Sequence, residues 1–314
     1  MTDTRYLVHG VFWDGPPSPT SEHDGGTPVL RLQPPGGVFR EVSLEPGSRL
    51  AFERVIPGRF CLGHVKVFSA SNREHVLCPA HAPAVKGKQC ERCFVMDDSR
   101  LIHDFHRGGG RVPDGLRSYL MQDHWLYVAT FGDGTTKVGT ASNLRKWHRL
   151  ADQGAVAARY VARARDGAVV RVLEDHVTRE AGLTQQVRSA AKAEALTAPR
   201  PGGELDALNH GHAASVRALL GQSAVVDFEL VDESWVRPAQ AARLCAAGER
   251  HAYPQALDGG QHGFRIEALC GANALASLDG SDALFVVNLG QLAGGVIRLG
   301  DFASEVPAVQ EPLF

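Results

Sequence analysis

The sequence predicts an α+β protein, in which a central module with a three-stranded antiparallel sheet and helices lies between two β-rich ends. Three observations support this prediction. Short β-rich runs occur at both ends, a cysteine-rich loop region precedes the centre, and the hydrophobic period in the centre alternates between that of strands and that of helices. The four expected units are residues 1–60, 61–120, 121–200 and 201–314.

Length and charge limit the possible functions. A chain of 314 residues is longer than one typical domain, so we expect more than one unit with its own core. The formal net charge is −2, so binding to nucleic acid must depend on a local basic patch. The sequence has no run of about 18 apolar residues and no charged-then-apolar leader, which predicts a cytoplasmic protein without a membrane partner.

The N-terminal unit is expected to be a β region. Its β-rich runs are separated by segments rich in proline and glycine, and they cover residues 6–13, 29–32 and 38–42. The tail of the chain has runs of the same kind at residues 264–269, 284–288 and 296–299. Because the two ends are similar, we expect that they can join in one barrel-like sheet, with the central unit inserted between them.

A cysteine cluster follows the first unit. Four of the six cysteines fall in a short window, and they are Cys61, Cys78, Cys90 and Cys93. In a chain without an export signal, this clustering favours zinc over disulfides. Four thiolates suit a closed tetrahedral zinc site, which can fold a region with few apolar residues. We therefore predict structural zinc here, although His64 or His81 could replace a cysteine and buried free thiols are the alternative.

A histidine-rich stretch lies between the cysteines and the central unit. His103 and His106 flank Asp104-Phe105, and an arginine and three glycines follow. These side chains could ligate a second metal, and the glycine backbone could approach an anion. An exposed loop with locally capped histidines explains the same residues, so we assign no site here.

The central unit begins with a predicted β-hairpin. Residues 126–131 form an apolar, aromatic run, Gly132-Asp133-Gly134 makes a turn, and residues 135–138 return as a second strand. Gly139 is expected to end that strand. The glycine-rich turn between two β-rich runs is the feature that predicts the hairpin.

A helix, a strand and a second helix follow the hairpin. Ser142 is a suitable N-cap for the first helix, and Gly154 is suited to end it. From Ala155 the hydrophobic period changes to two, which predicts a strand. Asp166-Gly167 then begins a second helix. Its buried stripe, with Glu174 at the edge, is expected to consist of Val169, Val172, Leu173, His176 and Val177.

The last unit is expected to start with helices and to end in strands. Residues 183–197 and 205–220 have helical composition, and residues 224–231 predict a strand. The basic residues of these helices, Arg188, Lys192 and Arg217, are expected on a solvated face. Cys245 and Cys270 lie in apolar settings, so we expect them in the core.

The order strand, strand, helix, strand and helix, with a glutamate on the last helix, resembles the GIY-YIG nuclease module. The two tripeptides of that family correspond to Leu126-Tyr127-Val128 and Lys137-Val138-Gly139, with lysine at the position of the second tyrosine. Residues 149–155 resemble the RW-x-x-QGA stretch of an uncharacterised bacterial family that is built on this module. That family also has four cysteines upstream.

The resemblance implies a metal-dependent nuclease-like hydrolase that acts on phosphodiester bonds of DNA or RNA. In such a site, Glu174 would hold Mg²⁺ or Mn²⁺ and Arg149 would clamp the phosphate. Tyr127 would orient or deprotonate the attacking water. Lys137 would bind phosphate as a point charge or, if it is desolvated, act as a base.

Two other classes of function stay open. A catalytically silent, zinc-containing nucleic-acid-binding protein would grip phosphate with Arg145, Arg149, Arg159, Arg163 and Arg165. A small-molecule enzyme could reuse the module, which the near-neutral charge and Lys137 both permit. Tyr127 alone is explained as a strand-face aromatic and Glu174 alone as a helix-surface carboxylate, so the prediction depends on their ordered combination. The sequence does not define the substrate, the strand preference or the oligomeric state.

Overall fold

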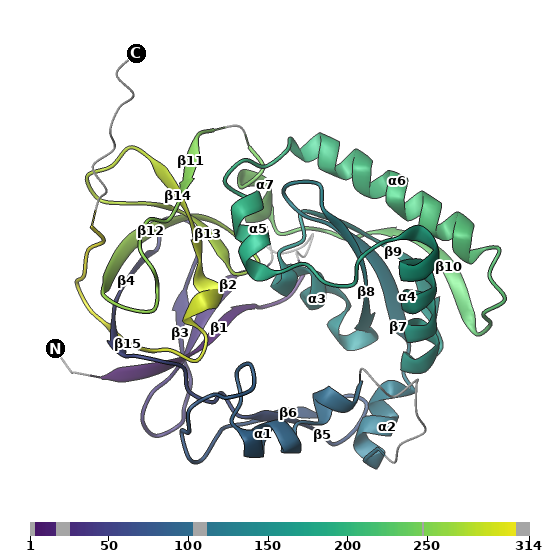
Figure 1. The fold of residues 1–314 in the computed structure, drawn as a ribbon, viewed down its shortest axis with the longest axis horizontal. Coiled ribbons are helices and arrows are strands. Elements are labelled where there is room, and N and C mark those ends of the chain that lie inside the picture. The colour runs from purple at the N-terminus through teal and green to yellow at the C-terminus, as the bar shows by residue number, and fades with distance from the viewer. Residues whose placement is uncertain (1–3, 17–25, 103–111, 247, 306–314) are drawn as a thin grey trace.

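The computed structural model describes residues 4–16, 26–102, 112–246 and 248–305 (Figure 1). These residues form a mixed α+β fold with sheets of nine, four and two strands, which confirms the predicted class. The two larger sheets lie side by side in Figure 1, and the two-stranded sheet with its short helices lies below them. None of the helices within the described ranges is long and apolar enough to cross a membrane.

The nine-stranded sheet combines the two ends of the chain. Its strands are β1 (Arg5–Trp13), β2 (Pro28–Gln33), β3 (Arg40–Ser43), β4 (Arg49–Ile56), β11 (Arg250–Ala252), β12 (Gln261–Cys270), β13 (Asn273–Ser277), β14 (Leu284–Asn288) and β15 (Val296–Leu299). β4 lies between β12 and β15, and β15 pairs with β1. Neither end of the chain can therefore form this sheet alone.

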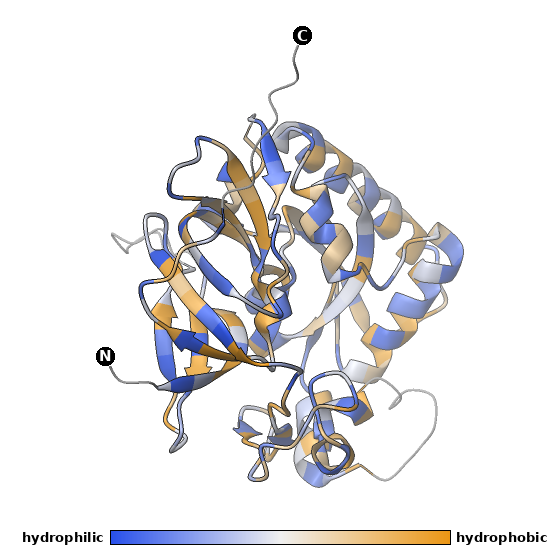
Figure 2. Ribbon diagram, turned by 60° about the vertical axis from the view of Figure 1, so that its left-hand side comes forward, coloured by the Kyte–Doolittle hydropathy of each residue, from blue (hydrophilic) through white to orange (hydrophobic). Residues whose placement is uncertain are grey.

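Alternating side chains fix which face of this sheet is buried. Leu50 and Phe52 on β4 and Phe264 and Ile266 on β12 are at most 1% exposed, and hydrophobic and hydrophilic residues alternate along several strands in Figure 2. The same hydrophobic cluster includes Tyr127 of the central unit. The nine-stranded sheet and the central unit thus share one core, which holds them in a fixed relation.

The central unit is built on the four-stranded antiparallel sheet. Its elements are β7 (His124–Thr130), β8 (Thr136–Ser142), α3 (Lys146–Gln153), β9 (Ala157–Ala164), α4 (Gly167–Ala181), α6 (Gly202–Leu220) and β10 (Phe228–Ser234). The strand order is β10-β9-β7-β8, so β7 lies between the other two predicted strands, and β10 adds a fourth. Apolar residues of α4 and α6 pack together against the strands.

Two local predictions about the hairpin and the first helix are wrong. Gly139 does not end the second strand, because β8 continues to Ser142. A glycine inside a strand often marks a close approach of another group, and the ring of Tyr127 packs against this one. Ser142 makes no side-chain cap, and a 3₁₀ turn, η2 (Asn143–Arg145), separates it from α3. The left-handed Gly154 does end α3, as predicted.

The predicted stripe of the second helix is right at Leu173 and Val177 and wrong at Val172. α4 buries Val170, Leu173, Glu174 and Val177, whereas Val172 is 43% exposed. The helix begins where Asp166 accepts hydrogen bonds from the N–H groups of the first turn, as the sequence predicts. Packing against the sheet rotates the buried face, so that Glu174 lies within it rather than at its edge.

The remaining elements cover the ends of the two large sheets. Below them lie β5 (His64–Val67), β6 (Arg73–Val76), α1 (Glu91–Met96), η1 (Asp98–Ile102) and α2 (Asp114–Leu120), which belong to the predicted cysteine-rich region. The other three are α5 (Ser189–Ala195), α7 (Ala239–Arg243) and η3 (Leu289–Leu292). α5 is shorter than the predicted helix at 183–197, and β10 begins later than the strand predicted at 224–231. His103 and His106 lie outside the described residues.

Candidate functional site

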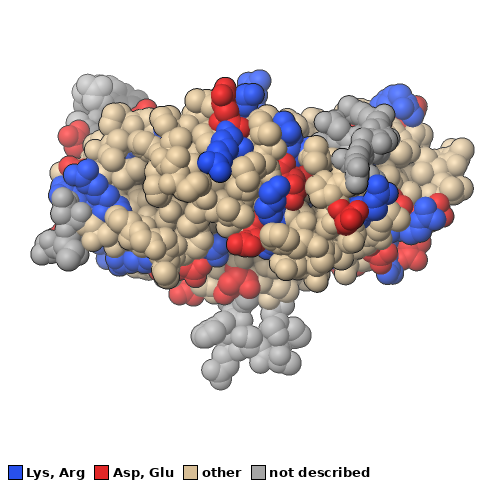
Figure 3. All heavy atoms as spheres, turned by 90° about the horizontal axis from the view of Figure 1, so that it is seen from below, with Lys and Arg blue, Asp and Glu red and all other residues tan. Residues whose placement is uncertain are grey.

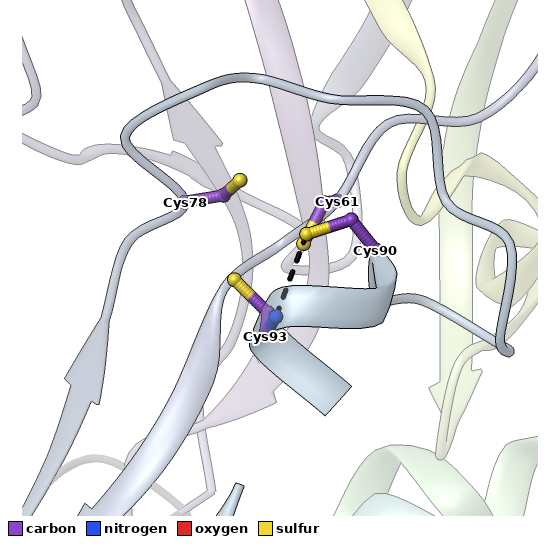
Figure 4. A group of neighbouring side chains, drawn as sticks. All are labelled: Cys61, Cys78, Cys90 and Cys93. Carbon is purple, nitrogen blue, oxygen red and sulfur yellow. Dashed lines mark hydrogen bonds between the residues drawn. The ribbon is translucent and has the colours of Figure 1, made fainter. Parts of the chain in front are cut away.

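The four clustered cysteines meet at one point. Cys61 follows β4, Cys78 follows β6, Cys90 is the N-cap of α1, and Cys93 lies in the first turn of that helix (Figure 4). Their ligand atoms all lie within 4.8 Å of one another. The N–H of Cys93 donates to Cys90 Sγ at 3.5 Å, and the N–H of Gly63 donates to Cys61 Sγ at 3.3 Å. Such N–H donors stabilise thiolates.

Glycine is required at the turn beside the first cysteine. Gly63 has φ +98°, and a Cβ on it would lie 2.0 Å from the carbonyl oxygen of Val76. Within the described parts of the chain, all six cysteines are free, and the metal-binding group consists of cysteines without a histidine. Four convergent thiolates can hold a metal ion such as zinc, and His64 and His81 are not needed as ligands.

The four residues implied by the resemblance gather in the central unit. Tyr127 comes from β7, Lys137 from β8, Arg149 from α3 and Glu174 from α4. Lys137 Nζ lies 5.6 Å from the centroid of the Tyr127 ring. The charges of Arg149 and Glu174 both act on the pKa values of Tyr127 and Lys137. Tyr127, Lys137 and Glu174 are at most 5% exposed, whereas Arg149 is exposed.

Tyr127 is held between a glycine and a glutamine. A Cβ on Gly139 would lie 2.5 Å from its hydroxyl oxygen, so glycine makes room for the ring. The hydroxyl donates to Gln153 Oε1 at 3.1 Å, at the end of α3. Burial raises the pKa of Tyr127, although the guanidinium of Arg149 acts in the opposite direction. Burial therefore disfavours the deprotonated form of Tyr127.

Lys137 is a buried amine in a positive environment. Its Nζ donates to the carbonyl oxygen of Gln185 at 3.1 Å, because residue 184 runs along β8 and pairs with Lys137. Burial, followed by the charges of Arg149 and Lys192, lowers the pKa of Lys137 to about 7. Glu174 acts in the opposite direction. Both protonation states of Lys137 are thus accessible near neutral pH.

Glu174 forms an ion pair with a neighbouring arginine. Arg171 Nη1 lies 2.5 Å from Glu174 Oε2, with the two residues at i and i+3 on α4. Burial raises the pKa of Glu174, and the charge and hydrogen bond of Arg171 oppose that rise. The carboxylate predicted to bind a metal is therefore part of a buried ion pair.

A basic cavity of about 450 Å³ lies between this cluster and the cysteine-rich region. The described residues that line it include five arginines, which are Arg73, Arg100, Arg145, Arg149 and Arg171. Arg145 is paired with Asp152 and Arg171 with Glu174, whereas Arg149 has no ion pair among the described residues. The face in Figure 3 instead mixes basic with acidic side chains. The five arginines make this cavity a local basic patch.

The other arginines considered for phosphate binding lie elsewhere. Arg159 pairs with Asp232, and Arg163 pairs with Asp123. Arg165 pairs with Asp227 at 3.1 Å. None of the three lines the basic cavity, and each has a carboxylate partner.

Sequence reasoning missed several residues of this site. Arg73 and Arg100 belong to the cysteine-rich region, and their place in the cavity wall depends on how that region packs. Lys192, expected on a solvated face, instead acts on the pKa of Lys137. Of these residues, only Arg171 could have been found from the sequence. It lies three residues before Glu174, and residues three apart lie on the same face of a helix.

Comparisons with models of protein families, with curated protein sequences and with solved structures returned no match. The functional interpretation therefore depends on the residues and geometry described above.

Proposed function

We propose that this protein is a metal-dependent, GIY-YIG-type nuclease-like hydrolase that cleaves phosphodiester bonds of DNA or RNA. The observation that carries the proposal is the basic cavity next to the cluster of Tyr127, Lys137, Arg149 and Glu174. The order β7, β8, α3, β9 and α4, with one of these residues on each element except β9, gives further support.

The charged side chains suit the transition state of phosphoryl transfer. Arg149 is exposed and has no carboxylate partner within the described ranges, so its guanidinium is available to bind a phosphate through two N–H groups. Lys137, once protonated, adds a positive charge in a buried setting, where charge stabilisation is strong. The hydroxyl of Tyr127 would orient the attacking water or a phosphate oxygen.

The side chains of the site can hold a divalent ion only if the substrate supplies further ligands. Magnesium sites often use one or two carboxylates, with phosphate oxygens and waters as the other ligands. Glu174 is one such carboxylate, but it must release Arg171 before it can bind an ion. Mg²⁺ or Mn²⁺ held there would lower the pKa of a bound water and so supply the nucleophile. We therefore expect weak binding of the ion to the free protein.

The test is a cleavage assay with end-labelled single- and double-stranded DNA and RNA, in Mg²⁺, in Mn²⁺ and in a chelator. The proposal predicts cleavage that requires the ion and is lost in Glu174→Gln, by a factor of about 100 or more. Arg163→Ala is the matched control, because Arg163 lies outside the cavity. Absence of cleavage with every substrate and ion, or an equally active Glu174→Gln variant, would rule the proposal out.

A catalytically silent nucleic-acid-binding protein is the second candidate. The observation that favours it is the ion pair between Arg171 and Glu174, which occupies the expected metal ligand. This candidate predicts nucleic-acid binding that weakens steeply with salt, without cleavage under any divalent ion.

A further inference from the structure

A second cavity adjoins the basic cavity. It has a volume of about 620 Å³ and is lined by residues of β1, β5, β6 and α1 and of the loop before α1. Gln89 and Asp97 line both cavities. Nε2 of Gln89 donates to Oδ2 of Asp97 and, at 3.0 Å, to the carbonyl oxygen of Gly63. These hydrogen bonds hold the wall that the two cavities share.

The second cavity differs from the first in its lining. Five aromatic and imidazole rings of the described residues line it, and they are Phe12, Phe94, His9, His64 and His75. The rings of His9 and His75 form a T-shaped pair with centroids 5.3 Å apart. Burial lowers the pKa of His9 to about 4, so this ring is uncharged at neutral pH. A concave surface of rings with a few polar groups is the usual form of a site for a small organic group.

Positive side chains lie beside both phenylalanines. Nζ of Lys86 lies 4.8 Å from the centroid of the Phe94 ring, and the guanidinium of Arg100, which lines the basic cavity, lies 4.7 Å from the same centroid. The guanidinium of Arg31 lies 4.2 Å from the centroid of the Phe12 ring. Proteins that bind single-stranded nucleic acid combine rings, on which bases stack, with cations that follow the phosphates. Both kinds of group occur together at the second cavity.

We propose that the second cavity binds one unpaired nucleobase while the phosphate of the same nucleotide lies in the basic cavity, so that the substrate is single-stranded nucleic acid. This inference rests on the proposed function for the place of the phosphate. A nucleotide that lies across Gln89 and Asp97 would have its base among the rings and its phosphate among the arginines.

The strand preference follows from the space that a base needs. A paired base is covered by its neighbours in the stack and by its partner, so it cannot enter a cavity unless it leaves the duplex. A base of a single strand enters without that cost. Lys86 is exposed, so it can leave the ring of Phe94 and contact a phosphate when a base stacks there.

The test uses two tetranucleotides with the same phosphates. One has a single 2-aminopurine base and three abasic residues, and the other has four abasic residues. Binding is measured by calorimetry in a buffer without added divalent ions, so that ion-dependent cleavage does not interfere. We expect the single base to raise the affinity by about ten-fold. We also expect the fluorescence of 2-aminopurine to fall on binding, because stacking on a ring quenches it.

Two substitutions test where the base lies. Phe12→Leu and Phe94→Leu remove the face of a ring but keep an apolar side chain, and each should reduce the advantage of the 2-aminopurine probe by about three-fold or more. Phe94 follows Cys93, so the metal content of that variant is measured, whereas Phe12 belongs to β1. Phe68→Leu, at a phenylalanine that lines neither cavity, is the control and should leave both affinities unchanged.

Arg149→Ala distinguishes the contacts of the phosphates from those of the base. Arg149 lines the basic cavity but not the second cavity. Its loss should therefore weaken the binding of both tetranucleotides to a similar extent and leave the ratio of their affinities unchanged.

The results separate this inference from the proposed function. No binding, equal affinity for the two probes, unchanged fluorescence, or a base effect that neither Phe12→Leu nor Phe94→Leu reduces would overturn the nucleobase site, even if the protein cleaves nucleic acid. A base effect that either substitution reduces would support the site, even if no cleavage is found.

Discussion

The protein has two polar clusters whose ionisable groups carry charges of opposite sign. Cys61, Cys78, Cys90 and Cys93 can ionise only to thiolates, so their cluster suits a cation such as zinc. Around Lys137, Lys192 and Arg149, the excess charge is positive, and the nearby carboxylate is already paired with Arg171. The charge of this second cluster suits an anion.

The comparison predicts a different role for each cluster. The cysteines connect a region whose own hydrophobic cluster is small, so a bound metal would supply free energy of folding. Lys137 lies in a central unit that already has a well-packed core, where its burial opposes folding. The predictions below test this contrast, from the largest expected effect to the smallest.

Loss of the metal should have the largest effect. We expect about one zinc ion per chain, and Cys93→Ser should unfold the cysteine-rich region because structural-site binding is coupled to folding. Metal analysis and circular dichroism of the purified variant measure both effects. Cys245→Ser, at a buried cysteine outside the cluster, should keep the metal. A metal-free parent protein with full structure would contradict this view of the cluster.

Glu174→Gln should destabilise the protein as well as inactivate it. The substitution leaves Arg171 without a counter-charge in a buried position, which costs about 1–3 kcal/mol. At the edge of a stripe, where the sequence places Glu174, the same substitution would change stability little. Urea unfolding of Glu174→Gln and of the double variant Arg171→Met with Glu174→Gln measures the effect. If the single variant is as stable as the parent, the ion pair is unimportant for the fold.

Gly139→Ala should disturb the tyrosine of the proposed site. The added Cβ would lie 2.5 Å from the hydroxyl oxygen of Tyr127, so the ring must move or the strands must separate. We expect a loss of about 1–3 kcal/mol in stability, as for other overpacked cores. Gly203→Ala is the control, because a Cβ at Gly203 would meet no atom within 4 Å. An unchanged midpoint of unfolding for Gly139→Ala would contradict the described packing.

Lys137→Met should stabilise the protein by about 0.5–2 kcal/mol, because it removes a buried group that favours the unfolded state at neutral pH. The pKa of Lys137 is about 7 in the folded protein, below its ordinary value of 10.5. Between these values the unfolded chain binds one more proton, so the stability of the parent should rise with pH. Urea unfolding at pH 7 and pH 9 should show a smaller rise in Lys137→Met. An equal rise in both proteins would show that another group causes the pH dependence of stability.

Local patterns predicted much of the central unit and of the metal site. Some features depend only on residues that are close in the chain, so they can be predicted from the sequence. They are the hairpin turn at Gly132-Asp133-Gly134, the helix end at Gly154 and the cap at Asp166. The CxxC spacing likewise places Cys90 and Cys93 at the start of α1.

The parts of the site that could not be predicted from the sequence depend on contacts between residues that are distant in the chain. The rotation of α4 that buries Glu174 follows from its packing on the sheet. Lys192 reaches the site because α5 brings it against the end of α3, and no local pattern indicates this. The cavity needs walls from two units, so its arginines could not be grouped from their positions in the chain.

The central claim is that the basic cavity acts on charge that develops during phosphodiester cleavage. The most direct test is Arg149→Ala, with turnover and nucleic-acid affinity measured at two salt concentrations. The claim predicts that turnover falls by about 100-fold or more while affinity changes much less. If the parent shows no turnover with any divalent ion, and Arg149→Ala weakens binding and reduces the salt dependence by roughly one contact, the nuclease proposal is contradicted.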